Sequence, residues 1–171
     1  GLENRVPVLM GTLGKALGSF GAYVAGDREL IQYLTNTARS FVFSTALPPA
    51  ACAASIAAFD ILEREPERRE RLRENRDRLA SGLVSLGIGV GNSITPILPI
   101  IVGDADKALK VSASLLEEGV YAPAIRPPTV PANTSRIRAT VMATHSEADI
   151  DLAIQAFAGL KSEGFFSANK E

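Results

Sequence analysis

One glycine-rich stretch dominates the sequence: Gly11-Thr12-Leu13-Gly14-Lys15-Ala16-Leu17-Gly18-Ser19-Phe20-Gly21. It follows a short apolar run, residues 6–10, and it carries a single lysine, Lys15. Glycines on both sides of that lysine allow a tight turn and the close approach of a flat ligand, because no side chain stands in the way. The setting predicts that Lys15 points at a bound ligand.

Two known phosphate-binding loops can be excluded at Lys15. A nucleotide P-loop requires a glycine six residues before its lysine and a serine or threonine directly after it, but Leu9 and Ala16 occupy those positions. The dinucleotide-binding pattern G-x-G-x-x-G does not match the glycine spacing of residues 14–18. A surface lysine in a glycine-rich turn, with no function, stays open as the alternative.

A family resemblance favours the functional interpretation. Residues 12–18 resemble the lysine signature of pyridoxal-phosphate enzymes of the aminotransferase-like superfamily, and residues 11–26 are similar to the α-oxoamine synthases. The resemblance implies a pyridoxal 5'-phosphate cofactor, with Lys15 as the catalytic Schiff-base lysine and Thr12 in contact with the cofactor's phosphate. A partly desolvated lysine can lose its proton near neutral pH and attack an aldehyde, so the chemistry suits the residue.

A second segment, residues 41–49, also resembles these synthases. It is similar to the segment that reaches into the cofactor site of the partner subunit, so the resemblance implies that Ser44 and Thr45 bind the cofactor. It further implies a homodimer with active sites at the interface. Turn chemistry before a helix is the alternative interpretation of both hydroxyl groups.

Candidate substrate-binding residues lie further along the chain. Arg138 matches the family arginine that holds the amino-acid carboxylate, which a planar guanidinium can bind through two parallel hydrogen bonds. Arg136 shares its strand face, so the sequence does not separate the two, and a strand arginine facing water is a third possibility. The loop 124–131 most resembles the family branch that joins L-alanine to a pimeloyl thioester, and Thr129 would line the acyl side.

The reaction implied by the resemblance is a decarboxylative condensation of an amino acid with an acyl thioester. Branches that use glycine with acetyl- or succinyl-coenzyme A are alternatives, and the acyl carrier, coenzyme A or a carrier protein, stays open. In the family, the acidic partner of the cofactor ring and a ring-stacking histidine come earlier in the chain. We therefore expect residues 1–171 alone to be inactive. A non-enzymatic alternative is that the chain acts only as an inactive folding or dimerisation module.

The expected fold class is α/β, the C-terminal part of a fold-type I pyridoxal-phosphate transferase. Residues 1–62 would be a remnant of the large cofactor-binding domain, and residues 63–171 a small α+β domain with its joining helix. The resemblance runs from residue 11 to about residue 159. The apolar run predicts a strand buried on both faces, and the alanine-rich residues 50–62 predict a tightly packed helix.

The joining helix is expected to run through residues 63–78, where 13 of 16 residues are charged. The later elements follow from periodicity and capping residues. They are a strand over 96–102, a helix over 105–118 capped by Asp104, a short strand over 120–125, an extended proline loop over 126–131, a strand over 136–142, and a last helix opened by Ser146 with Asp149 and followed by a tail from residue 165.

Composition narrows the possible partners. The chain has 18 basic and 19 acidic residues, which gives no field for nucleic acid or an anionic membrane, so small-molecule substrates are expected. The single cysteine, Cys52, excludes an internal disulfide and indicates the cytoplasm. The single histidine, His145, is expected to be structural, and no metal site is predicted. The first residues, which lack a methionine, suggest a piece of a longer protein.

Overall fold

The computed structural model describes residues 5–166. The chain divides into two compact units, residues 1–66 and residues 67–171. Each unit is described by itself below. The predicted domain boundary at residue 62, and the assignment of the two parts to a large and a small domain, stay predictions.

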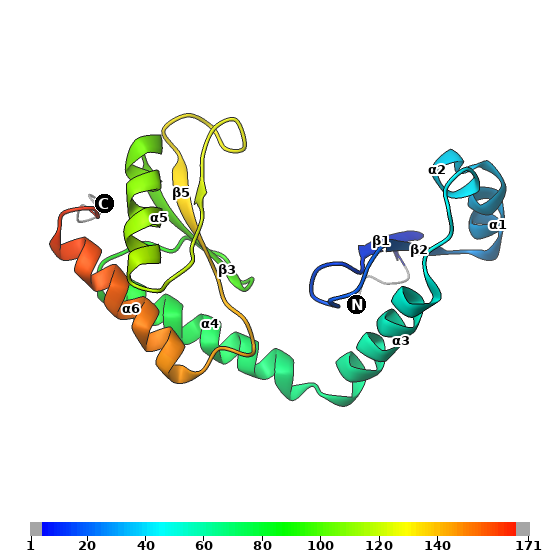
Figure 1. Ribbon diagram of the computed structural model, residues 1–171, viewed down its shortest axis with the longest axis horizontal. Coiled ribbons are helices and arrows are strands. Elements are labelled where there is room, and N and C mark those ends of the chain that lie inside the picture. The colour runs from blue at the N-terminus through cyan, green and yellow to red at the C-terminus, as the bar shows by residue number, and fades with distance from the viewer. Residues whose placement is uncertain (1–4, 167–171) are drawn as a thin grey trace. The chain divides into compact units, whose positions relative to one another are not determined.

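The first unit holds a two-stranded hairpin and three helices (Figure 1). These elements are β1 (Val8–Thr12), β2 (Ala22–Gly26), α1 (Arg28–Thr37), α2 (Arg39–Val42) and α3 (Pro49–Arg64). The two strands are antiparallel, with Val8 opposite Gly26 and Thr12 opposite Ala22. The loop that connects them, residues 13–21, carries Lys15.

The prediction of a strand buried on both faces is wrong for the first strand. β1 begins at Val8, after Pro7, which cannot donate a ladder hydrogen bond. Its side chains are exposed, to 70% for Met10. Among the described residues β1 pairs only with β2, and a strand of a two-stranded hairpin has no central position in a sheet.

The third helix also differs from its prediction. Within α3 the only buried residue is Ser55, and Ile56 is 65% exposed, so the helix is not tightly packed. It ends at Arg64, two residues beyond the predicted end, and the charged helix, predicted from residue 63, begins at Glu67. Pro66 explains the interruption, because proline lacks an N–H and pushes the preceding residue out of the helical region. Glu65 has φ −120° and ψ 62°.

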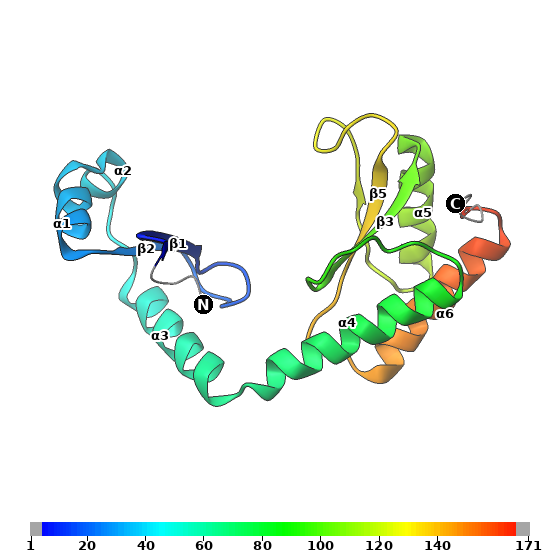
Figure 2. The same cartoon turned by 180° about the vertical axis from the view of Figure 1, so that it is seen from behind.

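The second unit is a small α+β arrangement. Its elements are α4 (Glu67–Ser85), β3 (Ile97–Gly103), α5 (Ala105–Glu117), β4 (Ala124–Ile125), β5 (Ser135–Thr140) and α6 (Glu147–Ser162). The three strands form an antiparallel sheet in the order β3-β5-β4. Figures 1 and 2 show α5 lying along this sheet, and α6 contacts both α4 and α5. Within residues 5–166, no helix combines the length and apolar character needed to cross a membrane.

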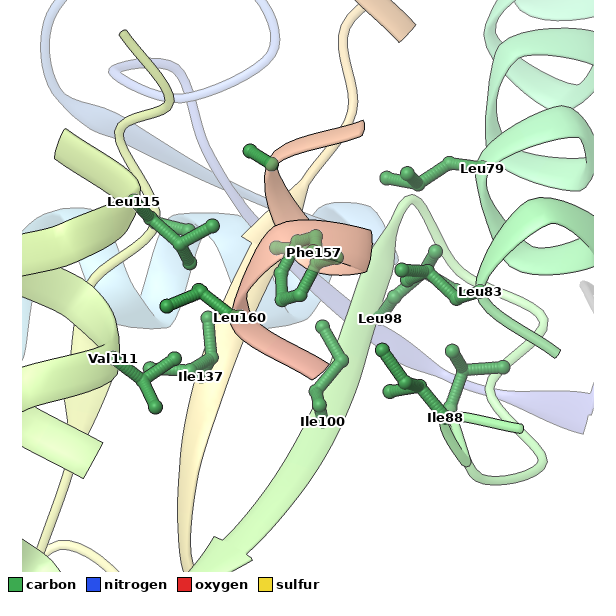
Figure 3. Close-up of a cluster of buried hydrophobic side chains, with 14 of the residues drawn as sticks. Leu79, Leu83, Ile88, Leu98, Ile100, Val111, Leu115, Ile137, Phe157 and Leu160 are labelled. Carbon is green, nitrogen blue, oxygen red and sulfur yellow. The ribbon is translucent and has the colours of Figure 1, made fainter. Parts of the chain in front are cut away.

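The hydrophobic core of this unit lies between the helices and one face of the sheet. Phe157 of α6 is fully buried and points between the side chains of the other elements (Figure 3). Its labelled neighbours in the core include Leu83 from α4, Val111 and Leu115 from α5, Leu98 and Ile100 from β3, and Ile137 from β5. Phe165 and Phe166 also pack against this core, so the predicted tail does not begin at residue 165. The rest of that tail, residues 167–171, lies outside the described residues.

Two predicted helix caps are confirmed. Asp104 accepts a hydrogen bond of 2.7 Å from the backbone N–H of Lys107 at the start of α5. Ser146 and Asp149 form a reciprocal capping box at the start of α6. The Ser146 backbone N–H, and then its hydroxyl, hold the pKa of the Asp149 carboxyl below its ordinary value. This cap therefore stabilises the fold above the unfolded-state pKa of Asp149, and the contribution is lost as the pH falls through the folded-state pKa.

Candidate functional site

The loop that carries Lys15 is closed by backbone hydrogen bonds. The Leu13 N–H donates to the Gly21 carbonyl at 2.9 Å, and the Ser19 N–H donates to the Leu13 carbonyl at 2.9 Å. A third bond of 3.0 Å runs from the Gly18 N–H to the Lys15 carbonyl. Because these bonds involve main-chain atoms only, the Lys15 side chain takes no part in holding the loop.

Glycine is favoured at two positions of the loop region, 11 and 18, for different physical reasons. A Cβ on Gly11 would stand 2.6 Å from the ring of Tyr23, the residue opposite it on β2, so a larger residue there would force the Tyr23 side chain to move. Gly18 has φ +60°, which side-chain-bearing residues rarely adopt, and no atom lies within 4 Å of the position of its absent Cβ. The space over Gly18 is therefore open beside Lys15, as a flat ligand requires.

Thr12 and Lys15, two of the predicted cofactor residues, are three positions apart in the chain. Thr12 is the last residue of β1 and Lys15 follows in the loop, and both are exposed. Within residues 5–166, the Lys15 amine takes part in no hydrogen bond or ion pair. A free amine beside open space over a glycine fits an aldehyde-bearing cofactor with a phosphate.

Two serines connect this loop to α3, and the sequence analysis missed them. The Ser19 hydroxyl donates to the Ala51 carbonyl at 2.9 Å. The Ser55 hydroxyl lies 2.8 Å from that of Ser19 and is buried. No motif marks this pair because the two residues are 36 positions apart. The link fixes the loop of Lys15 on the helix that follows the Ser44 segment.

Ser44 and Thr45 lie in an exposed coil between α2 and α3. The same coil contains Leu47, whose Cδ1 lies 2.9 Å from the position that a Cβ on Gly21 would take. The segment thus contacts the end of the Lys15 loop through Leu47. The binding of a cofactor by Ser44 and Thr45 stays a prediction.

Arg136 and Arg138 lie in the second unit, on the face of β5 opposite to the buried Ile137. Along β5 the buried Ser135, Ile137 and Ala139 alternate with these arginines. The Arg136 Nε donates to the Thr134 carbonyl at 3.0 Å, which ties its side chain to its own strand. Arg138 is exposed, and within the described residues its guanidinium makes no hydrogen bond or ion pair. Of the two, Arg138 is therefore the freer to bind a carboxylate.

The proline loop is irregular, as predicted, but it is not simply extended. The Thr129 N–H donates to the Arg126 carbonyl at 3.0 Å, which closes a turn. The Thr129 side chain is exposed. The turn replaces the predicted extended path because the three prolines remove backbone donors without preventing a bond from the threonine between them.

The lone histidine is held by backbone contacts. His145 Nδ1 accepts a hydrogen bond of 3.3 Å from the Met142 N–H. The buried Asn75 of α4 donates to the carbonyls of Met142 and His145, at 3.1 Å and 2.9 Å. The sequence analysis missed Asn75, which fixes the turn between β5 and α6. Among residues 5–166, no group of three or more His, Cys, Asp or Glu side chains is placed to hold a metal ion.

The chain resembles known proteins of one family. The model of the aminotransferase class I and II family matches residues 1–157. The 8-amino-7-oxononanoate synthase of Geotalea daltonii is 51% identical over 160 residues, which cover 92% of this chain and 41% of that protein. The enzyme of the same name from Methylococcus capsulatus is 51% identical over 154 residues, covering 90% and 40%. The chain thus spans about two fifths of the length of these relatives.

Solved structures confirm the fold. A serine palmitoyltransferase from Sphingomonas wittichii has a TM-score of 0.92 at 27% identity, covering 98% of this chain and 43% of that one. A structure of SPT with PLP has a TM-score of 0.91 at 28% identity, covering 97% and 42%. The predicted α/β aminotransferase-like fold is therefore confirmed.

The relatives also confirm the resemblance that was found from the residues around Lys15. Pyridoxal phosphate is the cofactor that the family and the structure solved with PLP indicate. Because the family model matches residues 1–157, most of this chain, the chain belongs to the aminotransferase class I and II family.

Proposed function

We propose that this chain is part of a pyridoxal-phosphate-dependent acyltransferase of biotin biosynthesis, an 8-amino-7-oxononanoate synthase. The reaction would join L-alanine to the pimeloyl group of a coenzyme A or carrier-protein thioester with loss of carbon dioxide. The observation that carries the proposal is the 51% identity to synthases of that name over nearly the whole chain. The exposed amine of Lys15 in its glycine loop supports it independently.

The residues of the first unit would hold the cofactor. Lys15 would bond to its aldehyde through Nζ, and Thr12 would bind its phosphate with its hydroxyl group. Ser44 and Thr45 would bind the cofactor held by the partner subunit. When bound, the conjugated ring supplies a sink for the electron pair left on the substrate. Freed from the aldehyde, the amine of Lys15 would accept the α-proton of the amino acid.

The residues of the second unit would hold the substrates. Arg138 would orient the amino-acid carboxylate through two parallel hydrogen bonds, and Thr129 would line the acyl side. The proposal includes a homodimer, because the Ser44 segment resembles one that reaches into a partner's site. It also includes a cytoplasmic location, which the single cysteine favours.

The proposal is tested by substrate competition in a complete enzyme. The Geotalea daltonii synthase would carry residues 1–171 in place of its matching segment. We expect L-alanine with a pimeloyl thioester to exceed glycine with acetyl- or succinyl-coenzyme A by at least about tenfold in kcat/KM, the scale on which an apolar pocket discriminates. A preference for glycine with a short acyl donor would move the chain to another branch of the family.

A matched pair of substitutions tests the carboxylate assignment in the same chimaera. Arg138→Ala is expected to raise the KM for L-alanine by about ten- to a hundredfold, the scale of a charge-assisted hydrogen bond. Arg136→Ala should have a smaller effect, because Arg136 is already bonded to the Thr134 carbonyl. The measurement is a set of initial rates at saturating acyl thioester. A larger loss in Arg136→Ala than in Arg138→Ala would show that the assignment is reversed.

A further inference from the structure

A cavity of about 480 Å³ lies in the second unit beside Arg138. Its lining comes from the segment before β4, the end of β5, the turn between β5 and α6, α6 itself, and Leu79 of α4. The lining residues include Tyr121, Pro123, Met142, Leu152 and Ala153. The walls are largely apolar, and the size is that of a small-molecule site.

One wall of this cavity is an unpaired strand edge. In an antiparallel ladder, the N–H and C=O of one residue point to the same neighbour, and successive residues alternate. The Val141 N–H bonds to the Pro96 carbonyl, on the β3 side, whereas the Arg138 N–H bonds to the Pro123 carbonyl, on the β4 side. The backbone groups of Thr140 therefore point to the β4 side.

Nothing among the described residues pairs with that edge beyond Pro123. Pro123 has no N–H, so it cannot return a bond to the Arg138 carbonyl. β4 covers only Ala124–Ile125, and the Ser112 hydroxyl of α5 donates to the Ala122 carbonyl at 2.8 Å, which holds Ala122 on that helix. Within residues 5–166, no backbone bond reaches the Thr140 N–H from this side. An amide donor and the Arg138 and Thr140 carbonyls thus face the cavity.

We propose that this edge and cavity bind the pantetheine arm of the acyl donor. The inference rests on the proposed function, and it concerns the chemistry that coenzyme A and a carrier protein share. A pantetheine arm is an uncharged chain with two amides, so it can pair with the edge at Thr140 as a short strand would. Its methyl groups, or the acyl chain beyond its sulfur, would contact Tyr121, Met142 and Leu152.

The charges around the cavity favour an uncharged arm over a phosphate. The positive charge of Arg138 is balanced by the negative charge of Asp149, and both residues line the cavity together with His145. A phosphate would need a surplus of cations, which this lining lacks. Binding here would bring the thioester to the residue that we assign to the amino-acid carboxylate.

The test uses the 171-residue chain and D-pantetheine, followed by amide NMR spectra and hydrogen exchange. Pantetheine should shift the amide signals of Thr140 and its cavity neighbours and slow the exchange of the Thr140 N–H. Thr140→Pro removes that donor at an edge where the N–H faces away from the sheet, a position that tolerates proline. We expect its affinity to fall by about three- to tenfold, the loss of one neutral hydrogen bond. Thr140→Val keeps the donor and should bind as the parent does.

Pantetheine binding that leaves the Thr140 amide unchanged in shift and exchange would overturn the proposal, and this readout holds even if Thr140→Pro fails to fold. Equal affinity of a folded Thr140→Pro variant would overturn it as well. Parallel titrations with coenzyme A and with a phosphopantetheinylated carrier protein show which of the two carries the pantetheine arm in the natural donor. That donor should bind more tightly than pantetheine alone and should still lose affinity in Thr140→Pro. None of these measurements needs pyridoxal phosphate or turnover, so their failure is separate from that of the proposed function.

Discussion

Lys15→Ala in the chimaeric synthase is expected to lower kcat by about a thousandfold or more, roughly 4 kcal/mol of activation free energy. The amine is proposed both to hold the cofactor and to accept the substrate's proton, and alanine can do neither. Lys15→Arg should lose activity to a similar degree, since a guanidinium stays protonated and does not attack an aldehyde. The measurement is the steady-state rate of ketone formation at saturating substrates.

The fold should be unaffected by this change. The loop is closed by backbone hydrogen bonds and tied to α3 through Ser19, so the lysine side chain contributes nothing to its shape. Lys110→Ala, which removes an exposed lysine of α5, is the matched control and should leave kcat unchanged. Turnover of Lys15→Ala within about tenfold of the parent would remove Lys15 from the chemistry.

Phe157→Ala is expected to lower the free energy of unfolding of the second unit by about 3–5 kcal/mol, the cost of truncating a buried aromatic residue. Phe157 is fully buried, and its ring lies 6.0 Å from that of Phe166, measured between centroids. It packs where α4, α5 and the sheet meet, so its truncation would leave a cavity in the core (Figure 3). Urea denaturation of the 171-residue chain, followed by circular dichroism, measures the change.

Leu116→Ala is the control for the core substitution. Leu116 lies on α5 in the same unit but is 58% exposed, so its truncation should change the stability by about 0.5 kcal/mol or less. If the two variants unfolded at the same urea concentration, Phe157 would not be the centre of this core.

The helix caps and the strand of Arg138 in the second unit could be predicted from the sequence, because the residues that define them are close together in the chain. Ser146 and Asp149 are three residues apart, and so are Asp104 and Lys107, so each cap could be found in a short window. The alternation around Ile137 identified the strand that carries Arg138. In each of these cases the residues that make the structure are near neighbours in the chain.

The errors in the first unit have a different origin. An apolar run predicts a buried strand only if other strands and helices cover it, and Met10 has no such cover among the described residues. The interruption at Pro66 could have been predicted, because proline in a run of helix-forming residues breaks the helix.

Other features of the candidate site depend on residues far apart in sequence. Ser19 meets Ser55 across 36 positions, and Asn75 reaches the His145 carbonyl across 70. The edge at Thr140 is unpaired because the segment before β4 does not continue the ladder along β5. No sequence pattern marks the point at which this pairing stops. The chemistry assigned to single residues stays a prediction, whereas the long-range contacts that position these residues had no local signal in the sequence.

The central claim is that Lys15 is the residue that holds pyridoxal phosphate, and chemical trapping tests it most directly. The 171-residue chain would be incubated with pyridoxal phosphate, reduced with borohydride, digested, and analysed by mass spectrometry. The account predicts one dominant pyridoxyl-modified peptide, the one that contains Lys15, and its loss in Lys15→Ala. Modification spread evenly over the other lysines, such as Lys107, Lys110 and Lys161, with no preference for Lys15, would contradict it.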